Sequence, residues 1–596
     1  MHRTKVLHTI ETEDSMGVLR SLTMESLLIE STESFGPFEC VSFVDGEAYT
    51  YRDFYDRVVS LRSYFISSGI KKGDKIVLLS ENQPNWMVCY FAITTMGAVV
   101  VPILTDFHTE EIRHIIEHSE AQAFCVSLKQ LEKVREVLDR SGGTAVCVTD
   151  LSEIKLPLGD EKIEKLNSTW KTIEMKEHPV EKLNFVDEED WASIIYTSGT
   201  TGQSKGVILT HRNIVYDAEA ASSIPNLGPG DRLLSILPLA HTYECTIGFI
   251  TPYRLGSHLY YISKPPAPVV LLPALKKVRP NAMLTVPLLI EKIYRSAVLA
   301  KFQKNVIIKT LYRIPPVRIL LNRAAGRKLM KTFGGNIHFF GIGGAALSED
   351  VEKFLREARF PYAIGYGLTE TSPLIAGCNA QTTRFRSTGP VLPGVSVKIA
   401  ETENGEGEGE GEILVKGPNV MKGYYKAPEK TAEVLTEDGW FHTGDLGRFD
   451  QDGYLYIRGR LKSMILGPSG ENIYPEAIEA VINEYDFINE SLVMEHEGKI
   501  VARVHIDYES FKEHVKGLAE SAGDASKQIG DYLNQLKKQV NKRLNVFSRV
   551  SDFIEELQPF EKTPTKKIKR YLYTHIGKKK KKDTKNNEDN NDSQIT

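Results

Sequence analysis

The sequence predicts an α/β protein: a large N-terminal domain of parallel-sheet α/β layers with a small β-rich subdomain, then a small mobile α+β C-terminal domain. Three observations support this fold class. Short apolar runs alternate with segments of helical spacing over roughly the first 150 residues, which is typical of parallel sheets. Strand patterning dominates after Ser387, and mixed patterning returns after Ile465. At 596 residues, the chain is long enough for at least two domains.

The N-terminal alternation begins with a hairpin. Val41–Val44 and Tyr49–Tyr51 have strand character and flank the turn signal Asp45-Gly46. The helices expected after it are 51–68, 86–96, 110–118 and 128–140, and the strands are 74–79, 98–102, 123–126 and 144–148. The two longest apolar runs, 98–104 and 268–272, predict buried strands. Residues 156–187 are charged and weakly patterned, so we expect a connector there.

A helix-rich, basic section is expected from Ile290 to Thr332, with a break at Pro315-Pro316. Its cations allow two interpretations: a solvated helix face, which we favour, or a patch for an anionic partner. These cations are Arg313, Arg318, Arg323, Arg327, Lys328 and Lys331.

Two expected strands, 336–340 and 360–364, each run into a glycine turn, with a helix between them at 350–358. Parallel strands end at the same edge of a sheet, so this arrangement suits a ligand at the carboxyl edge.

The C-terminal third predicts the β-rich subdomain and the second domain. Glu401–Glu412 is a low-complexity segment that we expect at an exposed hairpin tip. The expected strands are 394–400, 411–416, 454–458, 491–496 and 500–506, and the helices are 474–483, 510–519 and 526–544. The predicted division is an N-terminal domain 1–458, a hinge 459–465, a C-terminal domain 466–576, and a disordered Lys-rich tail 577–596.

Composition excludes several classes of protein. A net charge of −4 gives no overall attraction to nucleic acid. Six cysteines occur without CxxC pairs, which argues for reduced thiols and against a zinc site. The first 17 residues lack the apolar core of a signal peptide. No apolar run approaches the ~18 residues of a membrane-spanning helix, so we expect a cytoplasmic protein.

The loop from Thr197 to Lys205 has the composition of a polyphosphate site. It contains five hydroxyl residues and two glycines, and Gly206 follows. Backbone N–H groups, hydroxyl groups and an ammonium group would all donate to phosphate oxygens. The ordinary P-loop has Gly before its Lys and Ser or Thr after it, whereas Ser204 precedes Lys205 here. A mobile surface loop is the alternative.

The run Thr-Ser-Gly-Thr-Thr-Gly resembles the phosphate loop of adenylate-forming enzymes, although Ser204 replaces their usual Pro. Further motifs follow in the family's order over roughly residues 20–575: LPLAHTYE, TVPLLIEKIYR, GYGLTE, WFHTGD and KTPTKK. The closest likeness is to long-chain acyl-CoA synthetases (fatty acid–CoA ligases). The resemblance implies that a carboxylate attacks the α-phosphorus of ATP to give acyl-adenylate and pyrophosphate. The thiol of coenzyme A then displaces AMP.

The resemblance assigns roles to residues of the ATP site. Glu370 would bind Mg²⁺, a hard cation that prefers oxygen ligands, and Thr369 would contact the α-phosphate. Asp445 would bind the ribose hydroxyls, and adenine would pack against Tyr366. The implied nucleotide-binding set is Thr197, Ser198, Gly199, Thr200, Thr201, Gly202, Lys205, Gly343, Gly344, Ala345, Tyr366, Gly367, Asp445 and Arg460.

Three further residues are implied outside that set. Lys567 matches the lysine that grips the adenylation transition state, and the match favours it over its neighbour Lys566. Lys462 matches the pivot about which the C-terminal domain rotates. His241, in LPLAHTYE, either faces the acyl group or is structural.

The expected activity is therefore ligation of a medium- or long-chain fatty acid to coenzyme A, with ATP and Mg²⁺. Alternatives are transfer to a carrier-protein thiol, activation of another carboxylate, and a non-catalytic nucleotide- or acyl-binding protein. The five lysines Lys578–Lys582 either attract anionic lipid weakly, giving peripheral membrane association, or only solubilise the tail.

Overall fold

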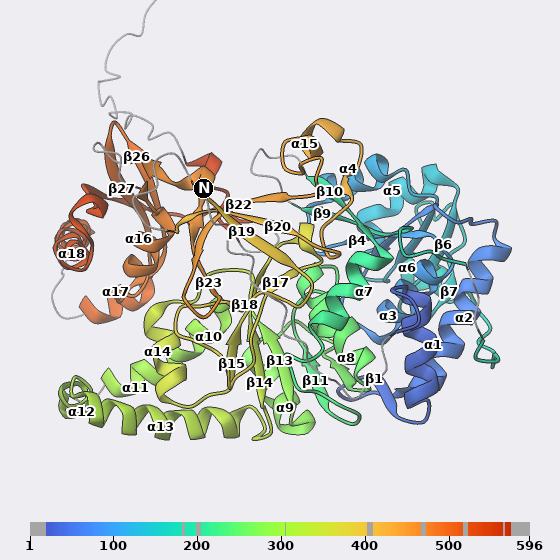
Figure 1. The fold of residues 1–596 in the computed structure, drawn as a ribbon, viewed down its shortest axis with the longest axis horizontal. Helices are drawn as coiled ribbons and strands as arrows, with labels where there is room; N and C mark the ends of the chain where they lie inside the picture. Colours follow the sequence, from blue (N-terminus) through green and yellow to red (C-terminus); the bar gives the residue numbers. More distant parts are fainter. Residues whose placement is uncertain are drawn as a thin grey trace, which may run out of the picture.

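The computed structural model describes residues 19–181, 185–197, 204–303, 306–401, 409–466, 472–515, 522–563 and 567–573. It has the predicted α/β class, with two large mixed sheets, a five-stranded antiparallel sheet and a three-stranded sheet near the C-terminus (Figure 1). None of the described helices combines the length and hydropathy needed to cross a membrane. All six cysteines are buried thiols.

The first large sheet has nine strands in the order β21-β10-β9-β4-β3-β5-β6-β7-β8. Its centre, β4-β3-β5-β6, is parallel. The strands are β3 (Lys75–Leu79), β4 (Val99–Ile103), β5 (Ala123–Val126), β6 (Thr144–Cys147), β7 (Ser152–Glu153), β8 (Lys171–Thr172), β9 (Trp191–Thr197), β10 (Lys205–Thr210) and β21 (Gly423–Tyr424). The accompanying helices are α1 (Met24–Phe35), α2 (Tyr51–Ser67), α3 (Pro84–Thr95), α4 (Thr109–Ser119), α5 (Leu131–Ser141) and α6 (Ile163–Asn167). The predicted N-terminal alternation is confirmed.

The second large sheet has seven strands in the order β15-β14-β13-β11-β12-β1-β2. All neighbours are parallel except the predicted hairpin β1–β2. The strands are β1 (Glu39–Phe43), β2 (Tyr49–Thr50), β11 (Arg232–Ser235), β12 (His258–Tyr261), β13 (Ala282–Thr285), β14 (Phe339–Ile342) and β15 (Tyr362–Ile364). The carboxyl ends of its parallel strands therefore lie along one edge.

Residues 268–272 are helical, so the strand predicted there is wrong. They begin α9 (Pro268–Val278), with Pro268 in its first turn, where a missing N–H costs nothing. The buried residues Leu271, Leu275 and Val278 have helical spacing, whereas Val269 is 79% exposed. The apolar run is one turn of an amphipathic helix, and its periodicity shows only when the following residues are included.

The predicted helix-rich section is confirmed, and Pro315-Pro316 begin its longest helix. The helices around this sheet are α7 (His211–Ala220), α8 (Thr251–Arg254), α10 (Pro287–Ile293), α11 (Ala300–Gln303), α12 (Val306–Leu311), α13 (Pro315–Thr332) and α14 (Glu349–Glu357). Two π-helical turns, Glu244–Ile250 and Tyr294–Leu299, precede α8 and α11.

The β-rich subdomain is an antiparallel sheet in the order β18-β23-β22-β20-β19. Glu401 pairs with Gly411, which confirms the predicted hairpin; its tip at 402–408 lies outside the described residues. The strands are β18 (Gly389–Pro390), β19 (Ser396–Glu401), β20 (Gly411–Lys416), β22 (Phe441–Phe449) and β23 (Tyr454–Arg460). The small hairpin of β16 (Tyr366–Gly367) and β17 (Leu374–Ala376) and the short helix α15 (Pro428–Ala432) lie nearby.

The C-terminal part has its own hydrophobic core, from Ile465 to Phe553. Its strands are β24 (Ile465–Leu466), β25 (Asn472–Ile473), β26 (Ile488–His496), β27 (Lys499–Ile506) and β28 (Asp552–Glu556), and its helices are α16 (Pro475–Ile482), α17 (Tyr508–Val515) and α18 (Ala522–Arg543). It forms the orange and red body at one end of the molecule (Figure 1). The domain limits stay a prediction, and the tail at 577–596 lies outside the described residues.

Candidate active site

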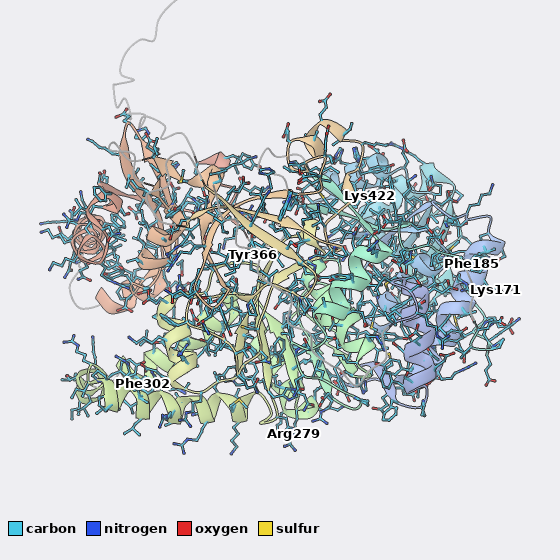
Figure 2. The ribbon with its side chains drawn as sticks, in the orientation of Figure 1. Lys171, Phe185, Arg279, Phe302, Tyr366 and Lys422 are labelled. Atoms are coloured by element: carbon cyan, nitrogen blue, oxygen red, sulfur yellow. The ribbon has the colours of Figure 1, made fainter. Side chains whose placement is uncertain are left out.

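The candidate site lies where β14 and β15 end, as the two glycine turns predicted. β14 leads into Gly343, and β15 leads into Tyr366, which lies near the centre of the molecule in Figure 2. Because the two strands are parallel neighbours, both turns emerge at the same sheet edge. The antiparallel sheet adds Asp445 from β22 and Arg460 from the end of β23.

Asp445 is the most buried charged residue of this group, with 4% of its surface exposed. Its Oδ1 lies 2.7 Å from Arg460 Nε, and its Oδ2 accepts a hydrogen bond of 2.8 Å from the Tyr366 hydroxyl. Burial raises the pKa of Asp445, while Arg460 and Tyr366 act in the opposite direction. The carboxylate is thus fixed in orientation and offers the strong acceptors that ribose hydroxyls need.

Glu370 forms a second polar centre with two residues from other elements. Its Oε1 accepts a hydrogen bond of 2.9 Å from the Tyr424 hydroxyl. The Nζ of Lys205 lies 4.7 Å from the centre of the Tyr424 ring. Burial lowers the pKa of Lys205, and Glu370 counters that shift. Tyr424 therefore joins the carboxylate to the lysine at the phosphate loop.

Two glycines bring the backbone close to this site. A Cβ at Gly367 would lie 1.7 Å from the carbonyl oxygen of Pro373, so only glycine allows this approach before Thr369 and Glu370. Gly344 has a φ of 84°, a conformation that side chains disfavour. Gly344 and Ala345 are exposed beside the site, consistent with contact to a base through the backbone.

Lys567 enters the site from the C-terminal part of the chain. Its N–H donates to Thr563 Oγ1 at 3.2 Å, and its carbonyl accepts from the Thr563 N–H at 2.8 Å, which closes a tight turn. Burial and then Arg460 lower the pKa of Lys567, whereas Asp445 and Glu370 raise it. Its side chain is nevertheless accessible to water. The ammonium group therefore lies near Asp445 and Glu370 while its side chain remains exposed to solvent.

His241 lies close enough to Lys567 to interact with it electrostatically. Burial lowers its pKa to about 4, and Lys567 contributes to the shift. Its ring is therefore neutral at pH 7, and the Nδ1 atom accepts the Tyr243 N–H at 3.3 Å. His241 and Lys567 are 326 positions apart in the sequence but interact here.

Part of the predicted phosphate loop lies outside the described residues: Ser198, Gly199, Thr200, Thr201 and Gly202, and so does Lys566. Thr197 ends β9 and pairs directly with Lys205 at the start of β10. The loop therefore connects two antiparallel strands, and its two ends are held together. Lys462 is exposed in the single turn Leu461–Ser463, close enough to Lys205 to lower the pKa of that lysine.

Sequence reasoning missed two residues that shape the site. Tyr424 orients Glu370, as described above. Glu412 accepts the Gly444 N–H at 3.0 Å and hydrogen-bonds His442 Nδ1 at 2.9 Å, which fixes the turn before Asp445. Glu412 lay at the end of a low-complexity acidic run. In a single sequence, nothing separates it from the solvated glutamates beside it.

A small apolar cavity of about 30 Å³ lies behind the glycine turns. Its lining comes from β13, β14, β15 and the π-helical turn, and none of its residues is charged: Ala221, Ile224, Pro225, Tyr243, Ile247, Leu284, Phe339, Gly341, Ala363, Ile364, Gly365, Leu374, Gly377 and Cys378. A cavity of this size holds one water molecule, not an acyl chain. Any apolar substrate has to open it, and Tyr243 already contacts the position of a Cβ on Gly343 at 3.0 Å.

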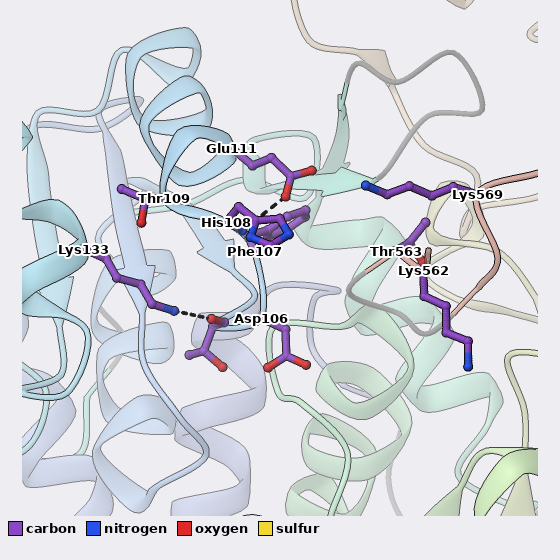
Figure 3. A pocket seen from close by; sticks show the side chains of 10 residues that line it. Asp106, Phe107, His108, Thr109, Glu111, Lys133, Lys562, Thr563 and Lys569 are labelled. Carbon is purple, nitrogen blue, oxygen red and sulfur yellow. Dashed lines mark hydrogen bonds between the residues drawn. The ribbon is translucent and has the colours of Figure 1, made fainter. Parts of the chain in front are cut away.

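A larger cavity of about 510 Å³ separates the two parts of the chain (Figure 3). The segment Thr105–Thr109 lines one side, and Lys562, Thr563 and Lys569 line the other. Lys133 donates to the carbonyl of Thr105 at 2.6 Å on the first side. Lys562, Thr563 and Lys569 lie close to Lys567 in the sequence, so the cavity borders the part of the chain that carries Lys567.

The donor set at Glu370 fits a magnesium ion bound with phosphate. Among the described residues, no three potential metal ligands gather in one place. A hard cation here would be held by the Glu370 carboxylate, with phosphate and water oxygens completing its shell, as is usual for Mg²⁺.

Comparison with known proteins gives three similarities. A family model described as AMP-binding enzyme matches residues 30–425. The long-chain-fatty-acid–CoA ligase FadD15 of Mycobacterium bovis is 29% identical over 554 residues, 85% of this chain and 87% of that protein. The long-chain-fatty-acid–[acyl-carrier-protein] ligase AEE15 of Arabidopsis thaliana is 28% identical, over 81% of this chain and 77% of the relative.

Among solved structures, the ATP-bound RpMatB-BxBclM chimera B1 matches with a TM-score of 0.73 and 23% identity. The match covers 93% of this chain and 98% of that one. At this level of identity the likeness concerns the fold, and it confirms the predicted architecture.

Proposed function

Because the chain belongs to the AMP-binding enzyme family, we propose that it ligates a medium- or long-chain fatty acid to coenzyme A through an acyl-adenylate. The observation that carries this proposal is the proximity of Lys567 to both Glu370 and Asp445, three residues that come from distant parts of the chain. Each supplies a group that attack of a carboxylate on ATP requires. The similarity to a long-chain-fatty-acid–CoA ligase along most of the chain supports the acyl substrate.

In the first half-reaction, the residues bind, orient and neutralise. Asp445 accepts hydrogen bonds from the ribose hydroxyls, and Tyr366 packs against adenine. The 197–205 loop donates hydrogen bonds to the β- and γ-phosphates. Bound at Glu370, Mg²⁺ would offset the negative charge of the phosphates. Lys567 and Thr369 then stabilise the charge that grows on the α-phosphate oxygens as the carboxylate attacks. Two anions that repel each other are thereby held in attacking geometry.

In the second half-reaction, the thiol of coenzyme A attacks the acyl carbonyl and AMP leaves. This step does not use Lys567, so we propose that the C-terminal domain, residues 466–576, rotates about the hinge 459–465 with Lys462 as its pivot. The cavity beside Lys562–Lys569 supports such movement, because few atoms have to be displaced.

The acyl chain enters the apolar cavity behind Gly341 and Gly365 in this proposal. Its uncharged lining supports an alkyl group over a polar acid. Each methylene that is buried contributes about 0.8 kcal/mol, so kcat/KM should rise with chain length until the opened tunnel is full. His241 lies near Lys567 and two positions before Tyr243 of the cavity lining, and in this proposal the reacting carboxylate sits beside it.

Transfer to a carrier-protein thiol is the second candidate, because AEE15 is named as a ligase of that kind. The test is thioester formation from acids of increasing length, with either coenzyme A or a phosphopantetheinylated carrier protein as acceptor. We expect long-chain acyl-CoA to be the dominant product. Highest activity on acetate or benzoate would reject the fatty-acid assignment, and exclusive acylation of the carrier protein would favour the second candidate. Failure of every acid to release pyrophosphate would support a non-catalytic binding protein.

A further inference from the structure

The helices below the seven-stranded sheet carry an unusual charge distribution. Residues 292–348 contain eleven Lys and Arg residues and no Asp or Glu. With +11 in this segment and −4 overall, the remainder of the chain carries −15. The positive charge is therefore local, and it belongs to α10 to α13 and the turns that join them.

Helix α13 presents these cations on a face that also exposes an apolar residue. Leu320, Arg323, Ala324, Arg327 and Lys331 recur at i, i+3, i+4, i+7 and i+11, so they share one side of the helix. Leu320 is 64% exposed, and the three cations are exposed as well. The opposite side is buried through Asn322, Gly326 and Leu329.

The described residues show no role for these exposed cations in stabilising the fold. Arg318, near the start of α13, forms a bidentate ion pair with Glu357. The Nη2 atom of Arg318 lies 2.8 Å from the Oε1 atom of Glu357. No described acidic side chain pairs with Arg323, Arg327 or Lys331 in this way. Within the described part of the chain, their charge therefore faces water without an acidic partner.

Exposed apolar side chains continue from α13 onto its neighbours. Val306 and Ile307 on α12 are 77% and 69% exposed, and Ile314 precedes α13. On α9, Val269 and Leu272 are exposed on the same side as Lys276. In Figure 1, α12, α13 and α9 follow one another along a single edge of the molecule. We call the exposed side chains of these three helices the basic apolar edge.

We propose that the basic apolar edge docks the protein on an anionic phospholipid surface. Isolated cations would suit any polyanion, but a nucleic acid offers no partner for Val306, Ile307, Leu320 and Val269. A bilayer interface accepts both, because phosphate headgroups meet the Lys and Arg side chains and the acyl boundary receives the apolar ones. No described helix can span a bilayer, so the association is peripheral. The proposal takes up the second interpretation of these cations, a patch for an anionic partner.

The test is co-sedimentation of the full-length protein with vesicles of phosphatidylcholine alone or mixed with phosphatidylglycerol. We expect binding to the mixed vesicles only. Each cation near an anionic surface changes partitioning about fivefold, so R323Q/R327Q/K331Q should weaken it about a hundredfold. L320S/V306S should remove the binding that persists at high salt, where charge is screened. The control K155Q/K162Q/K171Q removes three exposed cations at the opposite end of the molecule, where Lys171 is labelled in Figure 2, and should bind like wild type.

The Lys-rich C-terminal tail is the other part of the chain that could attract the protein to anionic vesicles. A chain ending at residue 576 should retain most of the binding if the basic apolar edge is responsible. The proposal is overturned if the triple variant on α13 binds as tightly as wild type, or if removal of the tail alone abolishes binding. Both substituted sets lie on exposed positions, and thermal unfolding curves matching wild type will show that the fold is intact. The measurement needs no substrate, so its outcome is separate from that of the ligase proposal.

Discussion

At the scale of single residues, Lys567 is the side chain whose position says most about the reaction. Its ammonium group interacts with Asp445, Glu370 and Arg460, although it comes from a turn in the last described segment of the chain. Burial among these groups lowers its pKa, but the two carboxylates favour its charged form. It can therefore deliver positive charge to a developing phosphorane without being permanently paired.

Lys567→Ala should separate the two half-reactions. Loss of one electrostatic contact to the transition state costs about 10²–10³ in rate, or about 3–4 kcal/mol, so adenylation should fall by that factor. Conversion of supplied acyl-adenylate and coenzyme A to thioester should persist. Lys566→Ala is the matched control and should be mild in both assays. A severe effect of Lys566→Ala instead would shift the catalytic role by one residue, and equal slowing of both halves by Lys567→Ala would make the lysine structural.

His211 links the active-site scaffold to pH. It is fully buried at the start of α7, where its Nδ1 accepts the Met24 N–H at 3.2 Å, and burial lowers its pKa to about 4. In the unfolded chain this histidine binds a proton near pH 6.5. The stability that depends on its neutral buried ring is therefore complete above that pH and is lost as the pH falls toward 4. The contribution is on the order of 3 kcal/mol.

The check is the free energy of unfolding by urea, measured from pH 4 to 8 for wild type and His211→Asn. Asparagine keeps an acceptor for Met24 but does not titrate, so the slope between pH 4 and 6.5 should flatten. An unchanged slope would assign the acid sensitivity to other groups, such as His241 and His258, whose pKa values burial also lowers.

Candidate site residues could be predicted from the sequence only where they lie in a contiguous motif. Asp445, Glu370 and Lys567 can be found because each sits in a short recognisable run, and the structure brings them close together, although their roles stay predictions. Tyr424 and Glu412 could not be found, because their importance arises from contacts to residues 54 and 32 positions away. Long-range contacts of this kind leave no periodic trace in one sequence.

At the scale of elements, the hairpin β16–β17 holds the turn that carries Thr369 and Glu370. Gly367→Ala would place a Cβ at 1.7 Å from the Pro373 carbonyl oxygen, so the backbone of the hairpin has to move. A shift of about 1 Å at the reacting groups can cost about 10² in rate, and we expect kcat to fall at least that far. Gly228→Ala, where nothing lies within 4 Å, should leave kcat unchanged. Wild-type kcat in Gly367→Ala would show that the Glu370 turn needs no such fixed backbone.

Elements were predictable where strands and helices alternate in the N-terminal part of the chain, and a short apolar run outside that alternation was ambiguous. The strands 74–79 and 123–126 and helix 51–68 match β3, β5 and α2 closely. The five apolar residues 268–272 were misassigned because one helical turn and a short buried strand look alike. Likewise, β22 was noticed for its motif but not as a strand, since its glycines and polar residues weaken the β pattern.

At the scale of the whole molecule, the account requires the C-terminal domain to change position between the half-reactions. Lys462 lies in the turn Leu461–Ser463 that follows β23. Lys462→Pro fixes φ there and removes a backbone donor, which should block rotation of the C-terminal domain. We expect normal acyl-adenylate formation and a loss of thioester formation, measured separately in rapid-quench assays. Loss of both steps, or of neither, would argue against this pivot.

The central claim is that this site activates a fatty acid by transferring the AMP group of ATP to its carboxylate, with release of pyrophosphate. The most direct measurement is exchange of labelled pyrophosphate into ATP without coenzyme A, with and without a long-chain fatty acid. Reversible adenylation predicts exchange that depends strictly on the acid, rises with chain length and falls about 10²–10³-fold in Lys567→Ala. Exchange without added acid, or none with any acid while the protein remains folded and binds ATP, would contradict the account.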